Sequence, residues 1–221
     1  MSQIARSTLK FLKDLKSNNN KVWFESNREA YEAARQDFID LTASLIDGMQ
    51  AFAPEFGSPD PKKCVFRIYR DVRFSKDKRP YKENFGANLG IGKGGTTAGF
   101  YVQIQPGGQS FAAAGAYMPE PAALASIRQE IDYNLKAFEA ILKAPAFKRS
   151  FSGLDEIELL RNAPKGYQPD NPALPYLRHK SFVVSRTFAD SAVLANDFRT
   201  QVVNTFKHAY PLVQFLNAAV E

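Results

Sequence analysis

The sequence predicts an α+β fold, a single domain in which an antiparallel β-meander sheet packs against N-terminal and C-terminal helices. Three observations predict it. Apolar residues recur at helical spacing in the first and last parts of the chain, they alternate with a period of two in between, and short turns link the alternating segments. The chain has 221 residues, of which 44% are hydrophobic, so it can bury a core of its own. We therefore expect one α+β domain over residues 1–221.

Residues 4–53 are predicted to be helical. Leu9, Leu12 and Leu15 lie on one face of a short helix, which ends at the turn-forming sequence SNNN. A longer helix carries apolar residues from Trp23 onwards at steps of three or four. The stretch APEFGSPDP ends this helix, because its three prolines and its glycine cannot continue it.

Residues 64–117 are predicted to be mainly β. We expect a first strand at 64–74, and the alternation of apolar and polar residues around Ala87 and Val102 marks two more. The sequence PGG then turns the chain into a strand at 109–117. Short links between consecutive strands indicate an antiparallel meander.

The second half of the chain is predicted to return to helices around one late strand. The expected order is a helical region at 121–150, a proline-rich excursion at 161–179, a strand at 180–186 and a C-terminal helix at 196–219. No internal repeat or low-complexity linker separates these parts, which favours one domain.

Positive charge is concentrated in one segment of the chain. Residues 62–82 hold nine Lys or Arg and two Asp, a local charge of +7, whereas the whole chain has a net charge of +6. The remainder therefore has a net charge of −1. A chain that is basic in one place only is typical of a protein with an anionic partner at that place.

The basic segment contains an arginine where a strand would need an apolar residue. If 64–74 is one strand, four apolar side chains share a face with Arg70: Phe66, Ile68, Val72 and Phe74. A guanidinium on an apolar face must be paired or must reach a cavity. A β-bulge near Asp71 would also solve the conflict by re-aiming the side chains.

The residue types of this segment indicate an anion site. Arginine forks suit phosphate or carboxylate, and lysines add movable charges. The expected ligand-binding residues are Arg67, Arg70, Arg73, Lys76, Lys78, Tyr81 and Lys82. The candidates for catalytic roles are Asp71, Asp77 and Tyr81, and three polar residues at strand ends are secondary candidates: Tyr117, Lys180 and Arg186. In the opposing interpretation the arginines pair with acids and the lysines are solvated.

The sequence identifies no cofactor. The stretch GIGKGGTTAG at 90–99 fails the P-loop pattern because a glycine follows Lys93, and we interpret it as a hairpin tip. His179, His208 and Cys64 do not form a Cys/His metal motif, so we expect no metal site. No dinucleotide-binding motif is present either.

Composition predicts a cytoplasmic protein. The single cysteine excludes an intramolecular disulfide, and the N-terminus lacks the apolar run of a signal peptide. No apolar stretch approaches the roughly 20 residues that cross a bilayer, so we expect no membrane partner. The sequence carries no indication of oligomeric state.

The basic segment resembles the hallmark of a bacterial family, domain of unknown function 2461. The pattern is Arg-x-x-Arg-Asp-x-Arg-Phe followed by Asp-Lys and then Tyr. Eight residues match it: Arg67, Arg70, Asp71, Arg73, Phe74, Asp77, Lys78 and Tyr81. Other stretches, from NNNKVWFESNREAYE to PLVQFLN, extend the resemblance almost end to end. The resemblance implies that the basic segment is a functional surface and names no reaction, because the family has no established activity.

Three functions stay open from the sequence, and we rank them in this order. The first is recognition of a phosphate-bearing ligand, a nucleic acid or a nucleotide, because Tyr69 and Tyr81 are interleaved with arginines. The second is an enzyme on a small anionic substrate, in which arginines clamp the anion and Asp71, Asp77 or Tyr81 moves a proton. The third is a structural module with a buried network of Arg70 and Asp71, whose partner is a protein.

Overall fold

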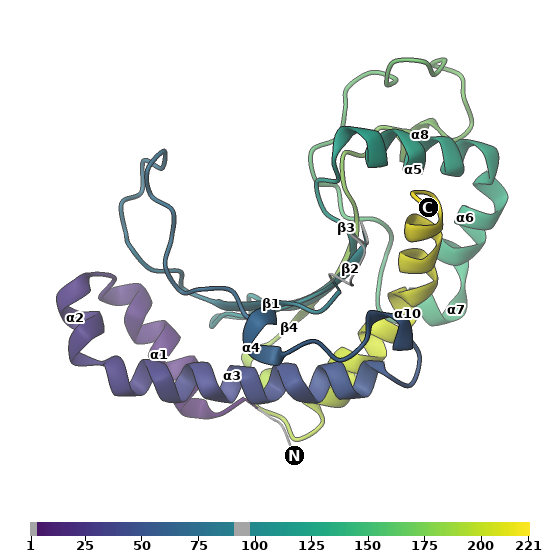
Figure 1. Cartoon of the computed structure of the whole chain (residues 1–221). Helices are drawn as coiled ribbons and strands as arrows, with labels where there is room; N and C mark the ends of the chain where they lie inside the picture. The colour runs from purple at the N-terminus through teal and green to yellow at the C-terminus, as the bar shows by residue number, and fades with distance from the viewer. Residues whose placement is uncertain (1–3, 91–97) are drawn as a thin grey trace. The chain divides into compact units, whose positions relative to one another are not determined.

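The computed structural model describes residues 4–90 and 98–221. It confirms the α+β fold: helices accompany a four-stranded antiparallel sheet with the strand order β1-β2-β3-β4 (Figure 1). Each strand lies beside its neighbour in the sequence, so the sheet is the predicted meander. The chain divides into two compact units, and strands of this sheet contribute residues to both.

The first unit contains the described residues of Met1–Leu89, Tyr101–Ala112 and Thr187–Asn204. Its helices before the sheet are α1 (Arg6–Ser17), α2 (Lys21–Ser26), α3 (Arg28–Met49), the short 3-10 helix η1 (Pro54–Phe56) and α4 (Pro61–Cys64). Helix α1 buries Leu9, Leu12 and Leu15 on one face. Asn20 precedes helix α2, and its side chain accepts a hydrogen bond of 3.0 Å from the Trp23 N–H and so caps the helix.

The strands that follow are β1 (Phe85–Asn88), β2 (Gly99–Ile104) and β3 (Ser110–Ala116). Phe85 lies opposite Ile104 in the β1–β2 pair, and its ring stacks on Phe38 of α3 with the ring centroids 5.6 Å apart. One face of these strands therefore packs on the helices. Tyr101 and Gln103 alternate with the buried residues of β2 and lie on its other face. That outer face carries the candidate site.

The turn between β2 and β3 is fixed by a carboxylate. Gly107 and Gly108 each donate a backbone N–H to Asp190 at 2.9 Å, and Asp190 begins helix α9 (Asp190–Val193). Both glycines have positive φ values, 85° and 70°, which other residues adopt at a cost.

The second unit contains the described residues of Gly90–Phe100, Ala113–Arg186 and Thr205–Glu221. Its elements include α5 (Pro121–Tyr133), α6 (Leu135–Lys143), α7 (Pro145–Lys148), α8 (Leu174–Leu177), strand β4 (Phe182–Phe188) and most of helix α10 (Phe198–Ala218). Phe206 of α10 packs on Phe100 of β2 at 5.1 Å between centroids. At Gly115 the chain has φ 125°, and a Cβ there would lie 2.0 Å from the Phe182 carbonyl oxygen, so only glycine fits.

The prediction of a strand at 64–74 is wrong. Helix α4 takes Cys64, and the residues after it make only two isolated bridges, Val65 to Ala87 and Tyr69 to Tyr81. The chain leaves this pairing after Arg70, whose N–H donates to the Pro80 carbonyl oxygen at 2.9 Å. We call residues 70–80 the arm; Figure 1 draws this part of the chain as a loop between α4 and β1.

The predicted apolar face of that strand is wrong for the same reason. Ile68 is buried, but Phe66 is 47% exposed and Phe74 is 96% exposed. Arg70 pairs with Asp77 and its N–H donates to the Pro80 carbonyl oxygen, so the chain reverses direction within the arm and its alternation no longer marks two faces of a sheet. The predicted hairpin tip at 90–99 lies for the most part outside the described residues.

Candidate functional site

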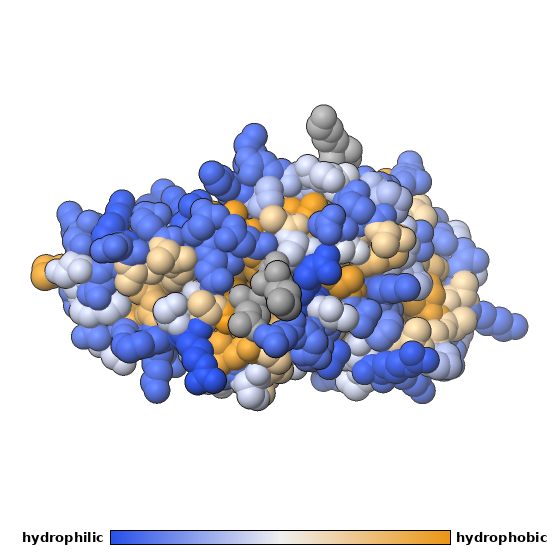
Figure 2. Space-filling view, turned by 90° about the horizontal axis from the view of Figure 1, so that it is seen from below, coloured by the Kyte–Doolittle hydropathy of each residue, from blue (hydrophilic) through white to orange (hydrophobic). Residues whose placement is uncertain are grey.

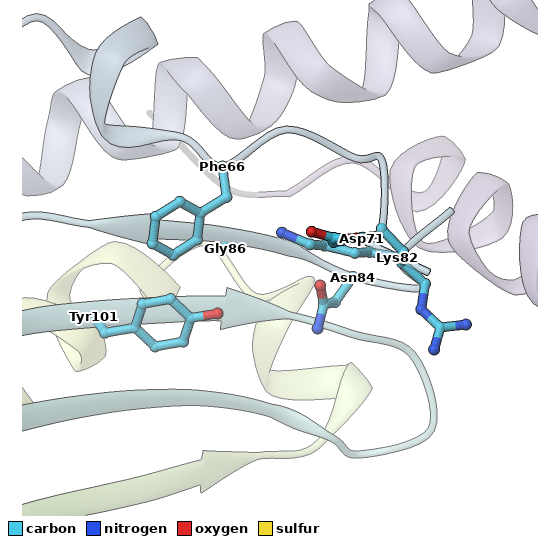
Figure 3. A pocket seen from close by; sticks show the side chains of 7 residues that line it. Phe66, Asp71, Lys82, Asn84, Gly86 and Tyr101 are labelled. Atoms are coloured by element: carbon cyan, nitrogen blue, oxygen red, sulfur yellow. The ribbon is translucent and has the colours of Figure 1, made fainter. Parts of the chain in front are cut away.

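A partly open pocket of about 500 Å³ lies on the outer face of the sheet in the first unit. Its lining combines two aromatic rings with charged and amide groups: Phe66, Arg70, Asp71, Lys82, Asn84, Gly86 and Tyr101. Figure 3 shows the rings of Phe66 and Tyr101 on one side of the pocket and Asp71, Lys82 and Asn84 on the other. The volume is that of an ordinary small-molecule site.

The aromatic side of the pocket is built by neighbouring chain segments. The rings of Phe66 and Tyr101 lie 6.1 Å apart between centroids, and Phe111 of β3 supports Tyr101 from 5.6 Å. The ammonium nitrogen of Lys82 lies 5.3 Å from the centroid of the Phe66 ring, a cation–π distance. The pocket therefore offers a flat apolar surface beside a positive charge.

Gly86 makes room for the hydroxyl group of Tyr101. A Cβ at Gly86 would lie 2.3 Å from this oxygen, so a side chain there would displace the tyrosine. The hydroxyl donates to Gln103 Oε1 at 3.0 Å. Burial raises the pKa of Tyr101 to about 12, so the phenol is neutral at physiological pH. It can form hydrogen bonds there, but it does not readily lose its proton.

Amide side chains continue from Tyr101 along the outer face. Gln103 donates through Nε2 to Gln105 Oε1 at 2.8 Å, and Asn84 donates to the same oxygen at 3.4 Å. These bonds fix the orientation of the amide that lines the pocket. The arrangement supplies uncharged hydrogen-bonding groups next to the rings.

Lys82 is a half-buried cation in this pocket. Burial lowers its pKa, and the nearby positive charge of Arg67 lowers it further. Within the described chain no carboxylate lies within 4.0 Å of either residue. The two cations repel each other, and the carboxylate that interacts electrostatically with Arg67, Asp71, is already hydrogen-bonded by Arg73.

Asp71 is held by a neighbouring arginine. It accepts hydrogen bonds from Arg73 Nε at 3.0 Å, from Arg73 Nη2 at 2.7 Å and from the Arg73 N–H at 3.2 Å. The hydrogen bonds from the Arg73 side chain and backbone lower the pKa of Asp71. Its carboxylate stays ionised at neutral pH and suits accepting a hydrogen bond better than taking a proton.

Asp77 is the centre of the hydrogen bonds that brace the arm. It accepts from Arg70 Nη1 at 2.7 Å, from Arg79 Nη2 at 2.7 Å and from the Arg79 N–H at 3.0 Å. The hydrogen bonds from Arg79 and Arg70 hold the pKa of Asp77 far below its usual range. Arg79 also pairs with Glu83, which ties the arm to the start of β1.

The predicted buried network of Arg70 and Asp71 is wrong in its partners and its burial. Arg70 pairs with Asp77, and Asp71 pairs with Arg73. The side chains of Arg70 and Asp77 are 26% and 37% exposed, so their ion pair is in contact with solvent. It braces the arm instead of holding the sheet to the helices.

Of the residues predicted from the sequence, Arg70, Asp71 and Lys82 line the pocket. Arg73, Lys76 and Lys78 lie on the arm outside the lining, and Lys78 donates to the Val72 carbonyl oxygen at 3.0 Å. Arg67 acts on the pocket through its charge on Lys82. Some predicted residues of the basic segment therefore line the pocket, and others lie only on the arm.

The structure corrects the roles suggested for Tyr81. Its side chain is 3% exposed and its ring stacks on Phe24 with centroids 4.0 Å apart. The Tyr81 backbone N–H donates to Asn19 Oδ1 at 3.1 Å, and Asn19 Nδ2 donates to the Tyr81 carbonyl oxygen at 3.0 Å. Tyr81 is a core residue and does not line the pocket, so we assign it neither ligand contact nor proton transfer.

The three secondary candidates belong to the second unit. Tyr117 follows β3 and is exposed. Lys180 pairs with Glu158 at 3.2 Å, and Arg186 donates to Thr205 Oγ1 at 3.4 Å. In the sheet order β4 is separated from β1 by two strands, so β4 does not pair with the strand beside the basic segment.

Sequence reasoning missed the residues that give the pocket its rings and amides. They are Phe66, Asn84, Gly86 and Tyr101. The signal for two of them was available, because polar and aromatic residues alternate with apolar ones along β2 and must face away from the core. The contribution of Phe66 depends on the irregular path of the chain after α4, which the sequence pattern does not predict.

The described residues contain neither a cluster of metal ligands nor a membrane-spanning helix. No three His, Cys, Asp or Glu side chains in residues 4–90 and 98–221 gather closely enough to hold a metal ion. In the same residues, no helix has the length and apolar character needed to span a membrane.

The outer-face pocket and the braced arm both belong to an α+β scaffold. Comparison with sequence families identifies the scaffold: residues 7–215 match the profile of a family described as conserved hypothetical protein (DUF2461). The chain belongs to this family, as the resemblance of its basic segment implied. No curated protein and no solved structure matches the chain.

Proposed function

We propose that this protein binds a small phosphate-bearing ligand of the nucleotide type in the outer-face pocket. The phosphate would lie between Lys82 and Arg70, and the planar ring of the ligand against Tyr101 and Phe66. The observation that carries the proposal is the pair Lys82 and Arg67, two cations that repel each other and form no ion pair within 4.0 Å among the described residues, while the carboxylate of the pocket, Asp71, is paired with Arg73.

The charges of the pocket support an anion as ligand. A half-buried ammonium group that forms no ion pair is unfavourable, and a phosphate would relieve both its desolvation and its repulsion by Arg67. Arg70 adds a guanidinium fork, which is already oriented by its bond to Asp77 at 2.7 Å. A preformed fork loses little entropy when it binds phosphate.

The rings and amides of the pocket support a ligand that is more than an inorganic anion. Two aromatic rings 6.1 Å apart give a planar group a surface to stack on. The ionised Asp71 and the oriented Asn84 can accept and donate hydrogen bonds at the edge of such a group. Phosphate, polar sugar and flat base occur together in nucleotides.

A thermal-shift and calorimetric screen tests the proposal. The ligands are the four nucleoside monophosphates, inorganic phosphate and glucose 6-phosphate. We expect a nucleotide to bind more tightly than phosphate alone, and Lys82→Ala to weaken it by about 10-fold, the loss of one charge-assisted hydrogen bond. Lys136→Ala, at an exposed position of α6, is the matched control and should bind normally. Equal affinity of both variants would overturn the proposal.

An enzyme acting on a small anionic substrate is the second candidate, because Arg70, Asp71 and Lys82 converge in one pocket. We rank it lower because the pKa of Asp71 is lowered and that of Tyr101 is raised to about 12, so neither group is suited to exchange a proton near neutral pH. Incubation of the protein with each nucleotide, followed by chromatography, separates the two functions. Simple binding returns the ligand unchanged.

The proposal also assigns the protein to the cytoplasm, where nucleotides are abundant and where its single cysteine, Cys64, would stay reduced.

A further inference from the structure

The arm presents one bare aromatic ring among cations. Phe74 is 96% exposed, although burial of an aromatic ring is favourable. The guanidinium carbon of Arg73 lies 5.9 Å from the centroid of this ring. Residues 70–80 contain five Lys or Arg and two Asp, so the ring is surrounded by net positive charge.

The arm is braced across its base, so it has a defined path. Arg70 Nη1 bonds to Asp77 at 2.7 Å and to the Arg79 carbonyl oxygen at 3.1 Å. Lys78 reaches across to the Val72 carbonyl oxygen at 3.0 Å. None of these bonds uses the Phe74 side chain, so the arm is held in shape while its ring faces solvent.

We propose that the arm is a stacking finger for single-stranded nucleic acid, with Phe74 as the platform for a base. The inference rests on the proposed function: the ligand would be a strand, with one nucleotide in the outer-face pocket and a neighbouring base on Phe74. Arg70 and Asp71 link the two places, because they line the pocket and also begin the arm. An exposed ring with adjacent cations is how proteins bind single strands without reading their sequence.

The surroundings of Phe74 favour a nucleic acid over an anionic membrane. Insertion into lipid needs an apolar face, and the other residues of the arm are charged or polar apart from the half-buried Val72 and Pro80. A base needs only one ring to stack on. Arg73, whose side chain is 76% exposed, can reach the phosphate next to a stacked base.

The test compares a mononucleotide with an octanucleotide on the same full-length variants. Fluorescence anisotropy at low salt measures the affinity for single-stranded DNA and RNA octamers of mixed sequence. Calorimetry measures the affinity for the mononucleotides. We expect Phe74→Ala to weaken octamer binding by about 10-fold and to leave mononucleotide binding unchanged, since stacking on one ring is lost. Phe74→Trp should retain octamer affinity, and Phe74→Leu should not. Tyr133→Ala, at a 74% exposed aromatic residue of α5, is the matched control.

The outcomes separate the inference from the proposed function. If mononucleotides bind but octamers bind no more tightly, or if Phe74→Ala has no effect on them, the stacking finger is wrong and the pocket function stands. If octamers bind in a Phe74-dependent way and no mononucleotide binds, the finger stands and the pocket function fails. Phe74-dependent binding to vesicles of phosphatidylserine and phosphatidylcholine, without octamer binding, would identify the arm as a membrane contact and overturn the inference.

Discussion

The protonation state of Lys82 should make anion binding in the pocket depend on pH. Its pKa is lowered by burial and by Arg67, and an anion beside it would oppose both effects. Anion binding needs the protonated amine, so affinity falls as pH rises through the lowered pKa of Lys82. Binding should therefore also be accompanied by proton uptake in that range.

The pH dependence of nucleotide binding follows from this. Between pH 7 and about pH 10.5, the usual pKa of lysine, we expect the affinity of the wild-type protein to decrease progressively. Lys82→Arg should keep its affinity over the same range, because arginine stays charged. Calorimetry in buffers of different ionisation enthalpy measures both the affinity and the proton uptake. Identical pH profiles for the two proteins would show that Lys82 does not contact the anion.

Tyr81 gives a second prediction for a single residue, which tests its assignment to the core. Its ring stacks on Phe24 at 4.0 Å, so Tyr81→Ala should lower the free energy of unfolding by about 3 kcal/mol. Tyr81→Phe keeps the stacked ring and should cost less than about 1 kcal/mol, with nucleotide affinity unchanged. Urea denaturation and calorimetry make the two measurements. If Tyr81→Phe is stable but has lost its affinity for nucleotides, the assignment of Tyr81 to the core alone is wrong and its hydroxyl takes part in binding.

At the scale of elements, the arm depends on one carboxylate. Asp77 collects the hydrogen bonds of Arg70 and Arg79, and these lower its pKa well below the ordinary value. A carboxyl whose folded pKa is lowered stabilises the folded state above its unfolded pKa, and this contribution is lost as pH falls through the folded pKa. The brace should therefore persist from neutral pH down to about pH 4, the unfolded pKa of Asp.

Hydrogen exchange tests the brace. In the wild-type protein the Arg79 N–H, which donates to Asp77 at 3.0 Å, should keep its protection factor between pH 7 and pH 4. Asp77→Asn should reduce this protection and weaken octamer binding, because the finger is no longer held in place. Asp47→Asn removes a similar charge from an exposed pair with Arg199 and should change neither. Full protection in Asp77→Asn would mean that backbone bonds alone hold the arm.

The same elements show what the sequence could and could not predict. Periodicity identifies helices and strands wherever a side chain faces either core or solvent, as along β2, and this was enough for the meander. It fails at 64–74, where Phe66 and Phe74 are exposed in spite of their apolar character. The path there is decided by Asp77 and Arg70, seven positions apart, and such pairing has no periodic signature. The cations of the pocket were therefore predicted, whereas its aromatic wall was not.

For the whole molecule, the distribution of charge limits the size of any nucleic-acid footprint. The chain outside residues 62–82 has a net charge of −1, and three of the four arginines within that segment, Arg70, Arg73 and Arg79, already pair with carboxylates. On the face shown in Figure 2, hydrophobic residues are interspersed with hydrophilic ones. A short contact of few phosphates fits these features better than a long track.

The salt dependence of octamer binding measures that footprint. With about three phosphates neutralised, one by Lys82 with Arg70 in the pocket and the others chiefly by Arg67 and Lys76, the slope of log K against log salt concentration should be near −2 for a single strand. The affinity should then fall roughly 15-fold between 50 and 200 mM salt, instead of the thousand-fold or more of a protein with many phosphate contacts. Lys76→Ala should reduce the slope by about 0.7, and Lys136→Ala should leave it unchanged. A slope of −5 or steeper would mean that cations outside the pocket and arm bind the strand, since these two places do not offer so many unpaired charges.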